Sequence, residues 1–139
     1  MSRRTCLLGG VSLAAALGLS ACATPPEPTA EQHQDALVQR FYRLLAQGDQ
    51  DGCIRLISAR HISKQMLADF EPGLRRILAG AKGKIDSHGG LQQVEIVERV
   101  VSEEDQLTKL RVLLRYGDGN SRRERMNVFL EDGVWKVQL

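Results

Sequence analysis

The stretch MNVFLEDGVWKVQL (residues 126–139) decides the fold, because its two apolar halves are joined by Asp132-Gly133. Asp-Gly is a strong signal for a two-residue hairpin turn, whose backbone twist matches that of the flanking strands. Such a turn pairs six apolar side chains across the hairpin: Leu130 with Trp135, Val128 with Val137, and Met126 with Leu139. All six then face the same side of the sheet, so the turn and the hydrophobic pattern predict the same hairpin.

Two earlier stretches extend this hairpin into a sheet. Residues 107–116 alternate, with Thr108, Leu110, Val112, Leu114 and Tyr116 on one face and Lys109, Arg111, Leu113 and Arg115 on the other. Residues 91–101 are rich in Val and Ile but change parity between Ile96 and Val97, which predicts a β-bulge. The loop around Asp118-Gly119-Asn120 must contain an odd number of residues if the apolar side chains of both strands are to share one face. We therefore expect a three-residue loop with a glycine bulge.

The first half of the domain carries helical patterns. Thr29 followed by Gln32 is a capping-box pattern, and Gly48-Asp49 separates the first helix from a short second one. A third stretch follows Ser63 as N-cap, and Pro72 inside it predicts a kink or two short helices. Residues 80–90 hold four glycines, which predicts a loop. Helices followed by an antiparallel meander of about four strands predict an α+β fold, with the helices on one face of the sheet.

Residues 34–139 resemble the nuclear-transport-factor-2-like (NTF2-like) superfamily, in which a cone of helices covers a curved sheet. The resemblance rests on Phe41-Tyr42 before Gly48-Asp49, on Tyr116-Gly117-Asp118-Gly119, and on the segment 132–137. It is closest to small bacterial lipoproteins of unknown function, although the sheet expected here is shorter than in many members. Some members are isomerases or dehydratases with an acid or His and a Tyr in the cone, and many dimerise through the outer sheet face.

Residues 1–21 have the features of an export signal. Arg3-Arg4 is followed by an apolar run, residues 7–19, that is too short for a permanent membrane span. The run ends in Leu19-Ser20-Ala21-Cys22, which resembles the lipobox of bacterial lipoproteins. We therefore expect cleavage before Cys22, acylation of this cysteine, and a firm anchor made of several acyl chains. The Pro-rich residues 22–33 then form a spacer between the lipid and the domain of residues 34–139.

Two alternatives to this export route stay open. An ordinary secretory cleavage after Ala21-Cys22-Ala23 also fits the small-residue rule, and the Arg3-Arg4 pair partly resembles a twin-arginine signal. Residue 23 is Ala rather than Asp, which by resemblance directs a Gram-negative lipoprotein to the outer membrane, facing the periplasm.

Charge and cysteine usage narrow the class of function. Without Arg3 and Arg4, 17 basic and 17 acidic side chains remain, so the net positive charge of the full chain does not indicate nucleic-acid binding. Of the three cysteines, Cys6 lies in the signal and Cys22 would carry lipid. Cys53 is then without a disulfide partner, and its apolar neighbours predict a buried thiol.

The residues after Cys22 contain no recognised cofactor, metal or nucleophile motif. His33, His61 and His88 lack metal-ligand spacing and are expected to be exposed in loops. We expect no cofactor and no catalysis, and a domain that serves either as an interaction module or as a cone for a small apolar ligand. Residues considered for the cavity are Tyr42, Leu114, Val128 and Trp135 for its lining, and Tyr116, Asp69, Glu98 and Glu124 for its polar groups.

The outer face of the predicted sheet gathers cations around apolar residues. The expected turn places Arg115 opposite Arg123, Leu113 opposite Arg125, Arg111 opposite Asn127, and Lys109 opposite Phe129, which also pairs with Lys136. Like charges in opposite positions are unfavourable, and arginines among apolar residues are typical of interfaces. Two interpretations stay open: a contact surface for a second copy or an acidic protein, or a solvated face whose arginines pair weakly with Glu124 and Glu131.

Overall fold

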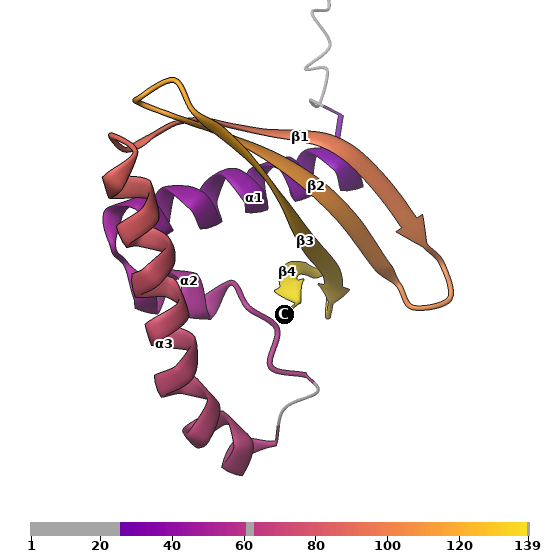
Figure 1. The fold of residues 1–139 in the computed structure, drawn as a ribbon. Helices are drawn as coiled ribbons and strands as arrows, with labels where there is room; N and C mark the ends of the chain where they lie inside the picture. Colours follow the sequence, from indigo (N-terminus) through magenta and orange to yellow (C-terminus); the bar gives the residue numbers. More distant parts are fainter. Residues whose placement is uncertain (1–25, 61–62, 139) are drawn as a thin grey trace, which may run out of the picture.

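The computed structural model describes residues 26–60 and 63–138. Within these residues three helices precede a four-stranded antiparallel sheet in the order β1-β2-β3-β4. The elements are α1 (Ala30–Gln47), α2 (Gln50–Arg55), α3 (Lys64–Ser87), β1 (Leu91–Ser102), β2 (Leu107–Tyr116), β3 (Ser121–Glu131) and β4 (Val134–Gln138). Figure 1 shows α1 along one face of the curved sheet and α3 crossing one end of α1. The predicted α+β fold is confirmed.

The predicted N-caps of the three helices and the predicted end of the first helix are confirmed. The Thr29 hydroxyl accepts the Gln32 N–H, and the Gln32 side chain accepts the Thr29 N–H, which completes a capping box. Gly48 ends α1 with a φ of 77°, a conformation that glycine adopts without strain. Because α1 begins at Ala30, residues 30–33 are helical, and the spacer expected to reach residue 33 is shorter than predicted.

The loop predicted at residues 80–90 is wrong for residues 80–87, because α3 continues to Ser87, and only residues 88–90 are non-helical. Pro72 also lies within this one helix, so the alternative of two short helices is wrong as well. Two contacts hold the C-terminal turns in place: Ile85 is buried against the core, and Lys82 pairs with Asp86 one turn on, at 2.5 Å. Burial of one apolar side chain outweighs the cost of about 1 kcal/mol for a helical glycine.

The hairpin predicted from residues 126–139 is confirmed. Asp132 and Gly133 have φ values of 48° and 79°, as a type I′ turn requires, and the pairs Leu130–Trp135 and Val128–Val137 form as expected. The third expected pair, Met126 with Leu139, cannot be compared, because Leu139 lies outside the described residues. Irregular pairing between Ile96 and Glu98 confirms the bulge in β1.

The turn between β2 and β3 has the predicted type but begins one residue earlier. Tyr116 accepts the Gly119 N–H and donates to the Asn120 carbonyl, which makes Gly117–Gly119 the three-residue loop, with Gly119 at a φ of 86°. Gly117 also donates to the Gly90 carbonyl at 2.9 Å, and an added Cβ there would lie 2.3 Å from the Gly89 oxygen. This backbone contact fixes the turn at Gly117, and every β2–β3 pair is therefore shifted by two residues from the expected register.

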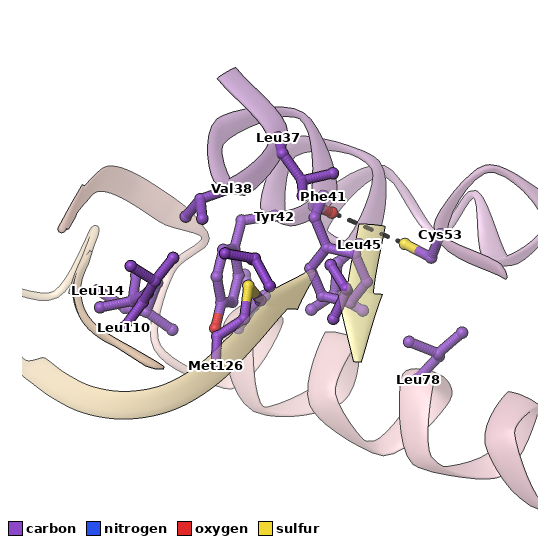
Figure 2. Packing of buried hydrophobic residues seen from close by; sticks show 14 of the residues in the cluster. Leu37, Val38, Phe41, Tyr42, Leu45, Cys53, Leu78, Leu110, Leu114 and Met126 are labelled. Carbon is purple, nitrogen blue, oxygen red and sulfur yellow. Dashed lines mark hydrogen bonds between the residues drawn. The ribbon is translucent and has the colours of Figure 1, made fainter. Parts of the chain in front are cut away.

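The core lies between the helices and the inner face of the sheet (Figure 2). The five residues of β2 predicted to face inward, Thr108, Leu110, Val112, Leu114 and Tyr116, are all buried. From α1 the buried stripe consists of Leu37, Val38, Phe41, Tyr42 and Leu45. Cys53 is fully buried, as predicted, and its Sγ lies 3.7 Å from the Phe41 carbonyl oxygen. Burial, with the charge of Asp49, raises the pKa of this thiol to about 11, so it stays protonated near neutral pH.

The segment that follows α2 closes the β4 side of the sheet. Ile57 forms a parallel bridge with Val137, whose backbone accepts the Ser58 N–H and donates to the Leu56 carbonyl. The C-terminal end of the described chain therefore lies beside the segment that follows α2, as Figure 1 shows. Edge strands expose unpaired backbone groups, and this bridge covers part of that edge.

Candidate functional site

A cavity opens between α1, the second half of α3 and the inner face of the sheet. Its volume is about 230 Å³. Most of its wall is apolar, and the polar groups come from four elements. The lining residues are Tyr42 and Leu45 of α1, Ile77, Gly80, Ala81, Lys84 and Ile85 of α3, Leu114 and Tyr116 of β2, and Glu124 of β3.

Helical and strand periodicity place the polar groups of this cavity. Tyr42 belongs to the buried stripe of α1, and Figure 2 shows its side chain extending from α1 towards the strands. Glu124 shares the inward parity of Met126 and Val128 but lies near the start of β3, where the sheet reaches solvent. The result is a carboxylate at the rim of a mainly apolar wall.

Tyr42 and Glu124 form a hydrogen-bonded pair. The Tyr42 hydroxyl donates to Glu124 Oε2 at 3.0 Å. Burial first, and the adjacent Glu124 charge second, raise the pKa of Tyr42 above its ordinary value. The phenol therefore remains protonated, and its proton is directed at the carboxylate.

A second polar cluster supports the cavity wall at Tyr116. The His88 ring stacks on the Tyr116 ring, with 4.9 Å between ring centroids, and His88 Nδ1 lies 2.8 Å from Asp118 Oδ2. The backbone N–H of Asn120 and, next, His88 lower the pKa of Asp118. These contacts join the end of α3 to the β2–β3 turn and hold Tyr116 in place.

The residues considered from the sequence divide between the cavity and other places. Tyr42 and Leu114 line the cavity, whereas Val128 is completely buried and Trp135 is half-buried away from this wall. Of the polar residues considered, Tyr116 and Glu124 reach the cavity. Asp69 is exposed on the first half of α3, and Glu98 lies on the outer sheet face, paired with Arg111 at 3.0 Å.

Sequence reasoning underrated Glu124 and missed the α3 side of the wall. Glu124 lies two residues before the buried Met126, so strand parity already places it inward. The residues Gly80, Ala81 and Lys84 were missed because residues 80–90 were predicted to be a loop.

The outer face carries the predicted cations in a different register. Arg111 lies opposite Arg125, Leu113 opposite Arg123, and Arg115 opposite Ser121. A hollow of about 300 Å³ lies on this face, lined by Glu98, Val100, Lys109, Leu110, Arg111, Arg125 and Asn127.

Phe129 is not the exposed anchor that the sequence suggested. Its side chain is only 8% exposed, and the guanidinium of Arg60 lies 5.4 Å from its ring centroid. Leu130, expected to face inward, is 41% exposed instead. Strand parity assigns Phe129 to the outer face, but Arg60, which is far from β3 in the sequence, lies over its ring.

The described residues contain no cluster of three or more metal-ligating side chains. His33 is exposed but lies on α1 rather than in a loop, and His88 is half-buried against Tyr116. His61 and Cys22 lie outside the described residues. Among the helices described here, none is long and apolar enough to cross a bilayer.

Comparison with known protein families identifies the family of this chain. The family described as "Domain of unknown function (DUF4878)" matches residues 27–138. The chain belongs to the DUF4878 family. No curated protein matches this DUF4878 chain.

Solved structures show what the DUF4878 domain is similar to. A Campylobacter jejuni protein designated a candidate NTF2-like transpeptidase aligns with a TM-score of 0.69 and 20% identity, covering 76% of this chain and 97% of that one. This likeness confirms the NTF2-like fold. The protein Aln2 from a Streptomyces species aligns with a TM-score of 0.46 and 16% identity, covering 79% of this chain and 88% of that one. The intermembrane space region of the chloroplast protein ARC6 aligns with a TM-score of 0.43 and 12% identity, covering 82% and 95%.

Proposed function

We propose that this DUF4878 domain is a non-catalytic module that binds a small, largely apolar molecule in the cavity between α1, α3 and the sheet. The observation that carries the proposal is a mainly apolar wall that contains one oriented polar pair, Tyr42 and Glu124. Binding sites are commonly concave and apolar, with a few placed polar groups. Ile77 lies at this wall with 66% of its surface exposed, and a bound molecule would cover it.

The same pair argues against acid–base catalysis. An isomerase or dehydratase needs a proton donor directed at its substrate as well as a base. Here the Tyr42 proton is directed at the carboxylate that would serve as the base. Turnover in a screen of isomerase, dehydratase and hydrolase substrates would contradict the proposal.

Two glycines of α3 allow a matched test of the cavity. Gly80 lines the cavity and Gly83 does not, and an added Cβ at either position meets no atom within 4 Å. Gly80→Phe should fill the cavity, while Gly83→Phe makes the same helical substitution outside it. With cyclohexanol as probe, saturation-transfer NMR should detect binding to the wild type and to Gly83→Phe but not to Gly80→Phe. Equal binding to both variants would place the probe elsewhere.

We propose further that lipid on Cys22 holds the domain at the membrane of the cell envelope. Leu19-Ser20-Ala21-Cys22 after a short apolar run supports this, as does Ala23 for the outer membrane of a Gram-negative host. Residues 23–29 separate Cys22 from α1 and span at most roughly 25 Å when extended. Cys22→Ser should move the protein from the membrane fraction to the soluble fraction. Retention of a cleaved chain at the membrane would overturn the anchor.

A second candidate function is docking of an acidic protein on the outer sheet face. Glu98 pairs with Arg111 at 3.0 Å there, and Arg125 lies directly opposite Arg111, so an anionic partner would offset the remaining positive charge. Two copies related by symmetry would bring such cations together, so charge favours an acidic partner over a homodimer. The double variant Arg111→Glu with Arg125→Glu should abolish crosslinks in cells and leave the mass in solution unchanged. Wild-type crosslinks would show that the face is only solvated.

A further inference from the structure

Within the cavity, the Tyr42–Glu124 pair offers hydrogen-bond acceptors but no free donor. A carboxylate has about four acceptor positions and no donor, and the Tyr42 hydroxyl has one proton. That proton is used, because Tyr42 donates to Glu124 Oε2 at 3.0 Å. The pair therefore keeps acceptor positions on Glu124 and on the Tyr42 oxygen. A ligand that satisfies this pair must itself donate.

The local charge agrees with the hydrogen-bond count. The Glu124 carboxylate is only 36% exposed, and it raises the pKa of both Tyr42 and Tyr116 through its charge, after burial in each case. Both phenols stay neutral as a result, so the Glu124 carboxylate supplies the negative charge at this wall. A partly desolvated carboxylate attracts a cation more strongly than one in bulk water.

The cations near the cavity do not reverse this preference. Arg122 Nε lies 3.4 Å from Glu124 Oε1, and its side chain is about half exposed. Lys84 of α3 lines the wall but is an exposed residue, so water screens its charge. An anionic group placed at the Tyr42–Glu124 pair would be repelled by the Glu124 carboxylate.

We infer that the cavity binds a small primary amine in its protonated form, with the ammonium donating to Glu124 and Tyr42 and the apolar body against the wall formed with Leu114 and Ile77. This inference rests on the proposed function and names its ligand class. The cavity of about 230 Å³ is larger than a 150 Å³ apolar cavity known to hold benzene. A six-membered ring with one amine therefore fits the space.

Three cyclohexyl compounds distinguish a preference for amines from binding of any apolar ring in the cavity. Cyclohexylamine, cyclohexanol and cyclohexanecarboxylate share the ring and differ in the polar group. On the purified full-length chain near neutral pH, we expect the amine to bind about tenfold or more tightly than the alcohol, and the acid to bind more weakly than both. Dissociation constants from NMR titration provide the comparison.

Glu124→Gln tests the carboxylate without removing its shape, because the glutamine carbonyl can still accept the Tyr42 proton. We expect this variant to lose about tenfold or more in amine affinity and to bind cyclohexanol as the wild type does. Tyr42→Phe should reduce amine affinity by a smaller factor.

The outcomes separate the two proposals. If the three compounds bind alike and Gly80→Phe removes all three, the cavity is a binding site and the amine inference is wrong. If Glu124→Gln leaves the amine affinity unchanged, the inference is also wrong. If none of the compounds binds the wild type, or none is lost in Gly80→Phe, the proposed function fails together with the inference.

Discussion

The side chains of β2 alternate regularly between the two faces of the sheet, but burial follows this alternation more closely on the inner face than on the outer face. On the inner face every predicted position, from Thr108 to Tyr116, is buried, and Glu124 is polar where the cavity reaches the rim. On the outer face cations alternate with apolar residues, and Phe129 is covered while Val100 is 52% exposed. Parity therefore predicts the inner face of β2, but it predicts neither the exposed Leu130 nor the covered Phe129.

The largest expected effect contrasts neighbouring leucines of β2 on opposite faces. Leu110 is 2% exposed in the core, so Leu110→Ala should lower the free energy of unfolding by about 2–5 kcal/mol. Leu113 is half-buried on the outer face, and Leu113→Ala should cost less than about 1 kcal/mol. Urea denaturation measures both. Equal losses would mean that the outer face is covered by a second copy.

The next prediction concerns the β2–β3 register, which the turn at Gly117 sets. Gly117→Ala places a Cβ 2.3 Å from the Gly89 oxygen, well inside van der Waals contact. The backbone must shift, and we expect a loss of about 1–3 kcal/mol. Gly83→Ala, in open space on α3, should instead stabilise the domain by up to about 1 kcal/mol. An unchanged stability for Gly117→Ala would show that this contact does not fix the turn.

A smaller effect tests why Phe129 is covered on the outer face. The guanidinium of Arg60 lies over its ring, and a partly exposed cation–π contact contributes about 0.5–1 kcal/mol. Arg60→Ala should therefore cost about that much and increase the exposure of Phe129. Arg60→Lys keeps a cation and should recover part of the loss, and failure of Lys to do so would argue for packing by the planar group.

The smallest expected effect is the pH dependence of stability that comes from the turn between β2 and β3. Asn120 and His88 lower the pKa of Asp118 below its ordinary value of 3.8, so the folded state favours the charged carboxylate. This contribution is present above pH 3.8 and is lost as the pH falls through the lower folded-state pKa. The difference in Tm between the wild type and Asp118→Asn should narrow from about pH 6 to about pH 3. A constant difference across this range would contradict the assignment.

Local patterns were enough to predict most of the fold. The capping box at Thr29, the stop at Gly48 and the Asp132-Gly133 turn are each specified by residues within a few positions of one another. The α3 error has the opposite cause: Gly80 and Gly83 lower the helix propensity of residues 80–87, and Ile85 restores the helix through a tertiary contact that the sequence does not display.

Part of the candidate site could be predicted from the sequence, because local patterns are enough to assign some of its residues. Tyr42 and Leu114 follow from periodicity within single elements. The pairing of Tyr42 with Glu124 joins residues 82 positions apart, and only the fold brings them together. The β2–β3 register was missed by two residues because the contact of Gly117 with Gly90 is also non-local.

The bridge between Ile57 and Val137 has a kinetic consequence. The four strands form a meander in which each strand pairs with its sequence neighbour, and such local pairs form early in folding. The bridge, in contrast, closes a loop of about 80 residues, whose entropy must be lost before the contact forms. We therefore expect this edge to close after the folding transition state. Substitutions at Ile57 would then accelerate unfolding and leave the folding rate nearly unchanged.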